Sequence, residues 1–291
     1  MTNGQFIMNE RYHPVKFNSK NTDLNFVDGV AFLQFPILEK IDFINHAFST
    51  RIGGVSKDEF KSMNLNFKRG DDPEKVLDNY KIFCKAAGFD FNSLVSSSQD
   101  HNTFVRRVTS NECGIGITRE HDIKSVDALI TNEPGVTLVT HYADCTPLLF
   151  VDPEKKAIGL AHAGWRGTVG KIGEATVNKM IDEFGSDPSD IIAVIGPAIG
   201  ACCYEVDTPV YEEFASLTEL KPAYFTKILG HGKYLIDLKE TNRRMLMEAG
   251  LLSINIEISD VCTKCNSGLL FSHRASNGKR GGLIAMMSIK N

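Results

Sequence analysis

The sequence predicts a single mixed α/β domain, and three observations support this fold class. Helix signals alternate with short apolar runs rich in β-branched residues along the chain. No Gly-, Ser- or Pro-rich stretch divides the 291 residues, and 42% hydrophobic with 23% charged content is typical of a globular protein. We expect residues 1–30 to form a polar N-terminal arm and residues 31–291 to form a single catalytic domain.

Three helices are predicted from their caps and apolar faces. Asp72 is typical of an N-cap, and Pro73 is typical of the first helical position. Apolar residues then recur at helical spacing until a glycine ends each segment. The predicted helices are 73–87 before Gly88, 168–184 before Gly185, and 238–249 before Gly250. Apolar runs predict strands at 136–139, 147–151, 157–161 and 191–195.

The second and third of these strands form a predicted hairpin. If residues 152–155 are its loop, Val151 pairs with Lys156. The same register places Cys145 directly opposite His162, with Cβ atoms about 4.5–5.5 Å apart. A thiolate and an imidazole at that distance can share one metal ion or form a nucleophile–base pair. A register slip of one residue would put them on opposite faces.

The residues around this pair are suited to ligand binding. Trp165, the only Trp of the chain, offers a flat face, and Arg166 offers a planar cation. Asp144 can orient a ligand or shuttle a proton. The alternative is a structural role, with Cys145 as a small buried side chain and His162 as a hydrogen-bonded core histidine.

Charge and composition exclude several functions. A formal net charge of -4 argues against non-specific nucleic-acid binding. No apolar run approaches the roughly 18 residues of a membrane span, and the N-terminus does not look like a signal peptide. We therefore expect a cytoplasmic protein. Seven scattered cysteines are not a disulfide framework there.

Several multi-residue motifs follow one another from about residue 46 to the C-terminus. They are Thr50-Arg-Ile-Gly-Gly-Val-Ser56, Ser62-Met-Asn-Leu-Asn66, Val126-Asp-Ala-Leu-Ile-Thr131, Ala143-Asp-Cys-Thr-Pro-Leu-Leu149, His162-Ala-Gly-Trp-Arg-Gly-Thr168, Ile195-Gly-Pro-Ala-Ile-Gly-Ala-Cys-Cys-Tyr-Glu-Val206 and Phe271-Ser-His-Arg274. Together they resemble the purine nucleoside phosphorylase family once called polyphenol oxidase or laccase-domain. The resemblance implies a mixed-sheet α/β sandwich of the laccase-domain type.

The resemblance also implies one zinc ion held by two histidines and a cysteine. By motif, the cysteine is Cys145 and one histidine is His162. The other is His101, in a segment that has Asn102 where the family usually has Gly. Gln99 opens that segment and is expected at the substrate. Three protein ligands leave an open position, which is typical of a catalytic zinc site.

The implied reaction is phosphorolysis of adenosine, inosine or methylthioadenosine to free base and ribose 1-phosphate, with adenosine deamination as a further activity. Arg51 is the first candidate for binding phosphate and Arg166 the second, because a guanidinium matches phosphate bidentately. A surface salt bridge is the alternative for either. Asp144 and Glu205 are candidate acid–base groups, Arg166 also counts among the catalytic candidates, and Trp165 is expected at the substrate.

Other functions remain open at this stage. One is a Cys–His hydrolase or amidase with Cys145 as nucleophile and His162 as base. Another is a copper-dependent polyphenol oxidase. Multicopper oxidases need a second, histidine-rich copper cluster, and the eight histidines of this chain include no His-x-His pair. Copper is therefore expected to be at most an opportunistic occupant of the site. A third is a metal-responsive partner-binding protein without turnover.

Two cysteine motifs lie outside this site. Cys262-Thr-Lys-Cys265 has metal-ligand spacing but lacks a second such pair in the sequence, so we expect a structural or incidental role. Cys202 and Cys203 are expected to line the core. We expect a monomer or small homo-oligomer whose partners are purine nucleosides and phosphate, with no nucleic acid or membrane involved.

Overall fold

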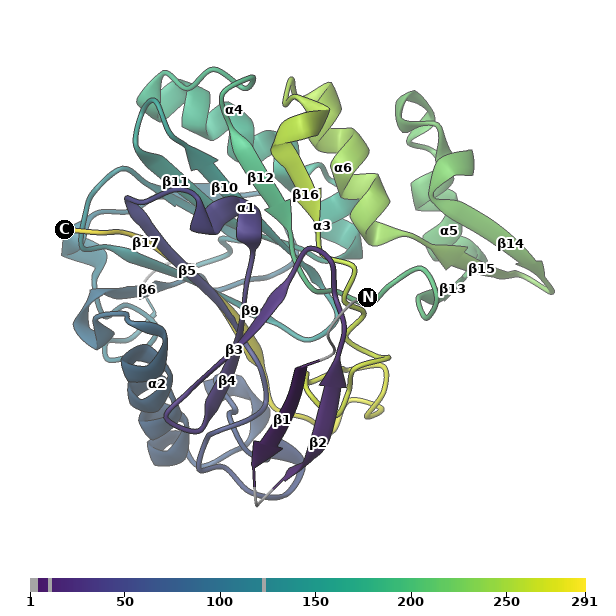
Figure 1. Cartoon of the computed structure of the whole chain (residues 1–291). Coiled ribbons are helices and arrows are strands. Elements are labelled where there is room, and N and C mark those ends of the chain that lie inside the picture. Colours follow the sequence, from purple (N-terminus) through teal and green to yellow (C-terminus); the bar gives the residue numbers. More distant parts are fainter. Residues whose placement is uncertain (1–4, 10–11, 122–123) are drawn as a thin grey trace.

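Two six-stranded sheets pack face to face, and helices cover their outer sides (Figure 1). The computed structural model describes residues 5–9, 12–121 and 124–291. The fold is a single-domain mixed α/β sandwich, which confirms the predicted fold class. Among the described residues, no helix combines the length and the apolar character needed to cross a bilayer.

Each large sheet mixes parallel and antiparallel pairs. The first runs in the order β16 (Ile256–Ile258), β12 (Ile192–Ile195), β10 (Thr146–Asp152), β11 (Ala157–Ala163), β8 (Ala128–Thr131), β7 (Val105–Arg107). The second runs in the order β3 (Asp23–Val27), β4 (Val30–Gln34), β5 (Ile44–Ser49), β17 (Leu283–Ile289), β9 (Thr137–Tyr142), β6 (Leu94–Ser96). The pairs β12–β16, β7–β8 and β6–β9 are parallel.

The remaining elements surround this sandwich. The helices are α1 (Pro36–Glu39), α2 (Pro73–Ala87), α3 (Trp165–Val169), α4 (Ile172–Phe184), α5 (Thr208–Ala215) and α6 (Leu238–Glu248). A smaller sheet has the order β13 (Glu205–Asp207), β15 (Lys233–Ile236), β14 (Thr226–Gly230), and β1 (Gln5–Asn9) pairs with β2 (Tyr12–Phe17). Short 3₁₀ turns lie at Asp58–Phe60, Phe67–Arg69, Phe91–Ser93, Ser110–Glu112, Thr218–Leu220, Pro222–Tyr224 and Ser253–Asn255.

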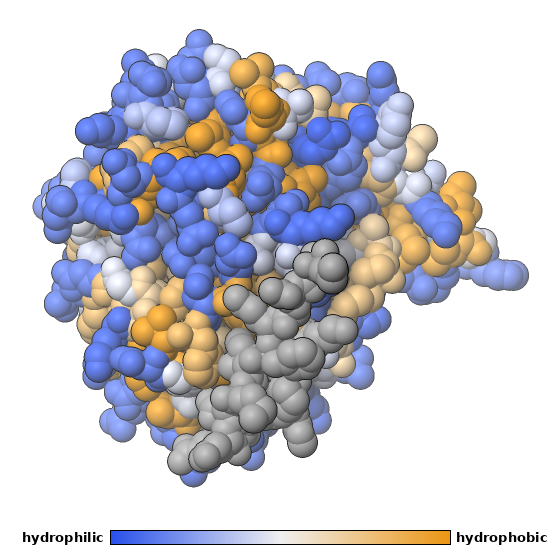
Figure 2. Space-filling view, viewed as in Figure 1, coloured by the Kyte–Doolittle hydropathy of each residue, from blue (hydrophilic) through white to orange (hydrophobic). Residues whose placement is uncertain are grey.

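Alternating side chains build the layers. On β10, Leu149 and Val151 enter the core between the sheets, whereas Leu148 and Phe150 pack under α4 and α6. This period of two is expected for a strand buried on both faces. The helix α2 covers the outer side of the second sheet through a separate apolar cluster. The hairpin β14–β15 projects from the body, and apolar side chains gather there on the surface shown in Figure 2.

The predicted helices are largely confirmed. Helix α2 begins after Asp72, whose side chain accepts from the backbone N–H of Glu74, and ends at Gly88 in the left-handed conformation. Helix α6 also matches its prediction. The predicted helix 168–184 is instead two helices, α3 and α4. It breaks at Lys171, whose φ of 64° ends the first helix and starts the second.

The predicted hairpin exists, but its register is wrong by two residues. The loop is 153–156, so Asp152 pairs with Ala157, and Pro147 is the residue opposite His162. The Asp152 carboxylate accepts from two backbone N–H groups of the turn, which fixes the later loop. A slip of two keeps Cys145 on the face of His162 as a diagonal neighbour, so the two side chains still meet.

Two elements lie where the sequence signals were weak. Strand β3 falls within residues 1–30, expected as a polar arm, and pairs along its length with β4 in the second sheet. Strand β17 brings the C-terminal segment to the middle of that sheet, between β5 and β9. The start of β17 lies near the predicted metal ligands, because Leu283 pairs with Tyr142, three residues before Cys145.

Candidate metal centre and substrate cavity

The three predicted metal ligands meet at one edge of the sandwich. His101 lies in the loop after β6, Cys145 in the connection from β9 to β10, and His162 near the end of β11. Strands β6 and β9 are parallel, so the segments after them leave the sheet at the same edge. The connection from β9 to β10 crosses between the two sheets, which places Cys145 beside the end of β11.

The ligand atoms of His101, Cys145 and His162 all lie within 4.8 Å of one another. The two imidazole rings have centroids 4.8 Å apart. His162 is buried, Cys145 is half-buried, and His101 is exposed. Two imidazoles and a thiolate are the donor types that zinc prefers, and three of them leave room for a substrate atom. The residues present therefore fit a zinc ion.

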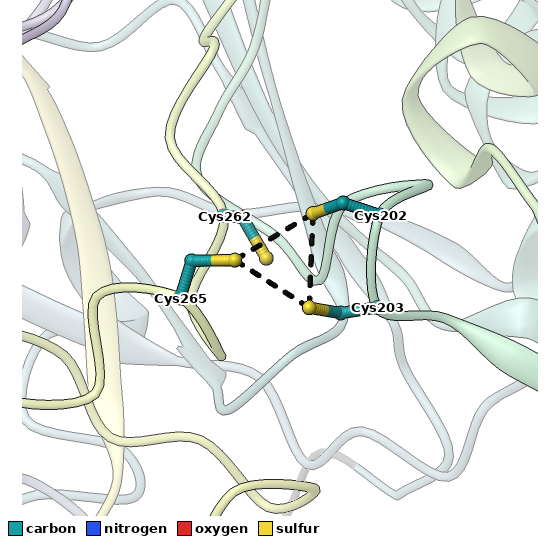
Figure 3. A group of neighbouring side chains, drawn as sticks. All are labelled: Cys202, Cys203, Cys262 and Cys265. Atoms are coloured by element: carbon teal, nitrogen blue, oxygen red, sulfur yellow. Dashed lines mark hydrogen bonds between the residues drawn. The ribbon is translucent and has the colours of Figure 1, made fainter.

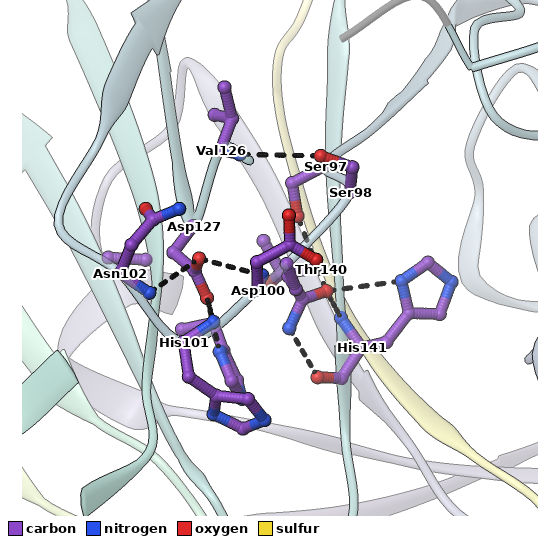
Figure 4. Close-up of polar contacts among 12 residues, drawn as sticks. Ser97, Ser98, Asp100, His101, Asn102, Val126, Asp127, Thr140 and His141 are labelled. Atoms are coloured by element: carbon purple, nitrogen blue, oxygen red, sulfur yellow. Dashed lines mark hydrogen bonds and ion pairs between the residues drawn. The ribbon is translucent and has the colours of Figure 1, made fainter. Parts of the chain in front are cut away.

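Asp127 contacts both histidines, and Figure 4 shows it beside Asp100, His101 and Asn102. One oxygen of its fully buried carboxylate accepts from His162 Nδ1 at 2.8 Å and from the backbone N–H of His101 at 3.1 Å. The other oxygen accepts from the N–H groups of Asp100 and Asn102 at 2.9 and 3.0 Å. With Nδ1–H donating to Asp127, the Nε2 atom of His162 is left as the metal-facing nitrogen.

Backbone conformations at the centre are unusual. His101 has a φ of 61° and Asp144 a φ of 85°, both in the region that favours glycine. Gly164 follows β11, and a Cβ there would lie 2.7 Å from His101 Nδ1 and 3.1 Å from Cys145 Sγ. Only glycine therefore lets the chain pass this close to the ligands.

Neighbouring groups shift the pKa values of both histidines at the centre. Burial lowers the pKa of His162, but the charge of Cys145 and the hydrogen bond to Asp127 outweigh it and raise the pKa to about 9. The pKa of His101 is lowered, by burial first and by His162 second. A metal ion bound at Nε2 of His162 would compete with a proton for this atom.

Two cavities meet at these ligands. The larger, of about 640 Å³, has a volume typical of small-molecule sites and is lined in part by Trp165, Tyr204 and Arg274. The smaller, of about 190 Å³, lies on the side of Ser97 and His141. His101 and Cys145 line both cavities, whereas His162 lines the smaller.

The larger cavity also holds the predicted acid–base residues. Asp144 is buried, and its carboxylate accepts from Thr263 Oγ1 at 2.5 Å and from the backbone N–H of Arg274 at 2.7 Å. Glu205 is exposed at the cavity wall, 3.8 Å from Lys233 Nζ. Asp144 thus ties two loops to the metal centre, while the Glu205 carboxylate faces solvent.

Guanidinium groups line the same cavity. Arg166 is exposed and stacks over the ring of its neighbour Trp165, with 4.1 Å between Cζ and the ring centroid. Arg280 is 7% exposed and lines both cavities, and its Nε has no hydrogen-bond partner. Burial lowers the pKa of Arg280 to about 10, with the nearby Arg69 adding to the effect. A buried cation with an unpaired donor is suited to an anionic ligand.

Arg51 lies away from the metal ligands, whereas Gln99 lies in the cavity that they line. Arg51 lines a third cavity of about 220 Å³, which Arg280 also lines. The Arg51 guanidinium donates there to the carbonyls of Lys61 and Ser267 and stacks on Phe271. The structure does not bring it to the metal ligands. Gln99 lines the smaller cavity, but both ends of its amide bond the backbone of His141. It therefore fixes the loop that carries His101.

The sequence analysis assigned no role to four residues of this site. Asp127, Tyr204 and Arg274 lie inside the quoted motifs, and Arg280 lies outside them. A charged residue between Val126 and the apolar start of β8 was the available signal for Asp127. Its four partners include three backbone N–H groups, which leave no trace in a sequence.

Comparison with known proteins identifies the family. A family model described as multi-copper polyphenol oxidoreductase laccase matches residues 45–290. The chain belongs to this family. Purine nucleoside phosphorylase YlmD of Bacillus subtilis (strain 168) is 38% identical over 244 residues, which cover 84% of this chain and 87% of that protein.

Two further relatives extend this result. Adenosine deaminase RL5, from an unknown prokaryotic organism, is 34% identical over 250 residues, which cover 81% of this chain and 93% of that protein. The crystal structure of YlmD from Geobacillus stearothermophilus matches with a TM-score of 0.86 at 33% identity, covering 94% of this chain and 100% of that one. The resemblance drawn from the sequence motifs is thereby confirmed, together with the fold.

Proposed function

We propose that this protein is a zinc-dependent purine nucleoside phosphorylase. It takes adenosine, inosine or methylthioadenosine with phosphate and releases the free base and the sugar 1-phosphate. The observation that carries the proposal is the convergence of His101, Cys145 and His162, two of which line a cavity of about 640 Å³ that several guanidinium groups also line. The relatives named purine nucleoside phosphorylase support the same substrate class.

His101, Cys145 and His162 would hold the ion, with Asp127 orienting His162. A bound zinc ion supplies a Lewis acid that polarises a substrate oxygen. The opening of the larger cavity at His101 and Cys145 leaves this position accessible to a nucleoside. Copper, the metal in the family description, is not favoured, because within the described ranges the candidate metal groups include no further cluster of histidines.

Arg280, Arg166 and Arg274 are the proposed phosphate-binding residues. All three line the larger cavity, and a guanidinium donates two parallel hydrogen bonds to a phosphate. Arg280 is the strongest of them because it is buried and has an unpaired Nε. The sequence-based choice of Arg51 is not carried into this proposal, because Arg51 lines neither cavity at the metal ligands, whereas Arg280 lines both of them.

In this proposal the purine of the nucleoside stacks on the aromatic rings of Trp165 and Tyr204, which line the larger cavity. A phosphate oxygen bonds the sugar C1′ as the bond from C1′ to the purine nitrogen breaks, and the electron pair stays with the base. The base then takes a proton. Glu205, exposed at the cavity wall, and Asp144, held by two hydrogen bonds, are the candidate proton donors.

Product analysis tests the proposal. The zinc-loaded protein is incubated with adenosine and phosphate, and the products are separated by chromatography. We expect adenine and ribose 1-phosphate in equal amounts, with no cleavage when phosphate is left out. Unchanged adenosine, inosine and methylthioadenosine would refute the assignment.

Adenosine deamination is a second candidate activity, favoured by the relative named adenosine deaminase. It would yield inosine from adenosine without phosphate, so the same chromatogram separates the two reactions. A Cys–His hydrolase with Cys145 as nucleophile is not favoured by the relatives' names. We further propose a cytoplasmic protein, a monomer or small homo-oligomer, that acts on small molecules.

A further inference from the structure

Four cysteines from two distant motifs meet at the end of the first sheet. Strands β12 and β16 are parallel neighbours, so the segments after them leave the sheet at the same edge. The first segment carries Cys202 and Cys203, and the second carries Cys262 and Cys265. A bridge between Ala198 and Cys262 continues the pairing beyond the strands. Strand topology alone therefore brings the two cysteine pairs together.

The sulfur atoms form a compact group (Figure 3). Cys265 Sγ lies 3.6 Å from Cys202 Sγ and 3.5 Å from Cys203 Sγ, and the latter two are 3.7 Å apart. Cys262 Sγ lies within 4.8 Å of each of the others. A tetrahedron of sulfurs about 2.3 Å from a central zinc ion has edges of about 3.8 Å, so three of these sulfurs already have the required spacing.

The surrounding backbone fits a bound metal thiolate. The N–H of Gly200 donates to Cys262 Sγ at 3.2 Å. A Cβ on Gly200 would lie 3.3 Å from Cys202 Sγ and 3.2 Å from Cys262 Cβ, so a side chain there would crowd the group. Lys239 is buried, and its ammonium bonds the carbonyl of Val261, next to Cys262. That cation offsets part of the negative charge of a tetrathiolate.

We propose that Cys202, Cys203, Cys262 and Cys265 bind a second zinc ion, separate from the His101–Cys145–His162 centre. Four thiolates complete a tetrahedron and leave no open position, so this site is structural. The Cys262–Cys265 motif has the second pair that a zinc site requires, which the sequence alone could not reveal. Cys202 is exposed, so the expectation that it lines the core is wrong, whereas the half-buried Cys203 packs against an apolar cluster.

A zinc ion at the four cysteines would stabilise two loops that line the larger cavity. The N–H of Ile199, three residues before Cys202, donates to the carbonyl of Asp144. Thr263, next to Cys262, donates to the Asp144 carboxylate. Tyr204, next to Cys203, lines the larger cavity. An ion that ties the two cysteine pairs together would therefore fix both loops that hold Asp144 beside Cys145.

Disulfide bonding is the competing use of these thiols. The described cysteines are all free, and the sulfur separations of 3.5–3.7 Å exceed a covalent bond of about 2.05 Å. Two disulfides would consume all four thiols and exclude the metal. Counting metal and thiols in the same sample distinguishes the two.

The test is zinc counting on the full chain, purified under reducing conditions without chelators. We expect two zinc ions per chain in the wild type. The double variant His101→Ala with Cys145→Ser should keep one ion, and so should Cys202→Ser with Cys265→Ser. Cys113→Ser, a half-buried cysteine outside both groups, is the matched control and should keep two.

Cobalt gives a second readout that does not depend on stability. The His101→Ala, Cys145→Ser variant reconstituted with Co²⁺ should show an intense thiolate-to-cobalt charge-transfer band and a tetrahedral ligand-field spectrum. That variant decides the question even if the Cys202 and Cys265 variant fails to fold. A metal-free protein from this variant, or disulfides among the four cysteines in mass spectra of freshly purified wild type, would overturn the proposal.

Discussion

Replacing Asp127 by Asn should weaken both the fold and the metal centre. The carboxylate accepts hydrogen bonds from His162 Nδ1 and from three backbone N–H groups, with two donors on each oxygen. An amide NH₂ in either orientation faces two of these donors and accepts from neither. Each buried donor left without an acceptor costs about 1–3 kcal/mol, so the free energy of unfolding should fall by about 2–6 kcal/mol.

The same change loosens the orientation of His162, and loss of such a partner typically lowers metal affinity about 10–100-fold. Urea unfolding and competition with a zinc-binding dye measure the two effects. Asp100→Asn is the matched control, because the side chain of Asp100 is exposed and accepts from Ser125 Oγ. An Asp127→Asn variant with the wild-type stability and zinc affinity would refute the role assigned to Asp127.

Three further predictions concern single sites. Gly164→Ala places a Cβ 2.7 Å from His101 Nδ1, so the zinc affinity and the rate of nucleoside cleavage should fall at least about tenfold. Gly268→Ala is the control and should change neither, because no atom lies within 4 Å of the new Cβ. Arg280→Met should raise the KM for phosphate at least about tenfold, with little change in the KM for the nucleoside. Lys279→Met, at an exposed position, is the control and should leave both KM values unchanged. Equal effects of Arg280→Met on both KM values would argue against phosphate binding at Arg280. Burial lowers the pKa of His46 from 6.5 to about 4, so the unfolded chain binds more protons between these values and stability falls as the pH falls through them. Between pH 7 and pH 5 this residue should cost the wild type about 2 kcal/mol in urea unfolding, and His46→Gln should lose correspondingly less.

The sequence predicted the part of the site that depends on strand periodicity. Cys145 directly precedes β10, and His162 lies on the neighbouring strand β11. Because side chains alternate with a period of two, an error of two residues in register left the two residues on one face. The turn itself was misplaced, since the side chain of Asp152 caps it from within the strand. His101 came from the family resemblance, because it reaches the site through a loop.

Long-range pairing was the part that the sequence could not supply. Asp127 acts mainly on backbone N–H groups, which every residue has, and Arg280 reaches the cavity from a loop just before the last strand. The two cysteine pairs become neighbours because β12 and β16 are adjacent and parallel, an arrangement that local patterns do not specify. The break at Lys171 similarly required a left-handed residue that helix periodicity did not indicate.

The central claim is that nucleoside cleavage by phosphate depends on the His101–Cys145–His162 centre. The most direct measurement is the rate of ribose 1-phosphate formation from adenosine by the wild type and by Cys145→Ser, with Cys113→Ser as the control. We predict a loss of at least about 100-fold in Cys145→Ser, with the control at the wild-type rate. Equal rates of ribose 1-phosphate formation in all three proteins would contradict the claim.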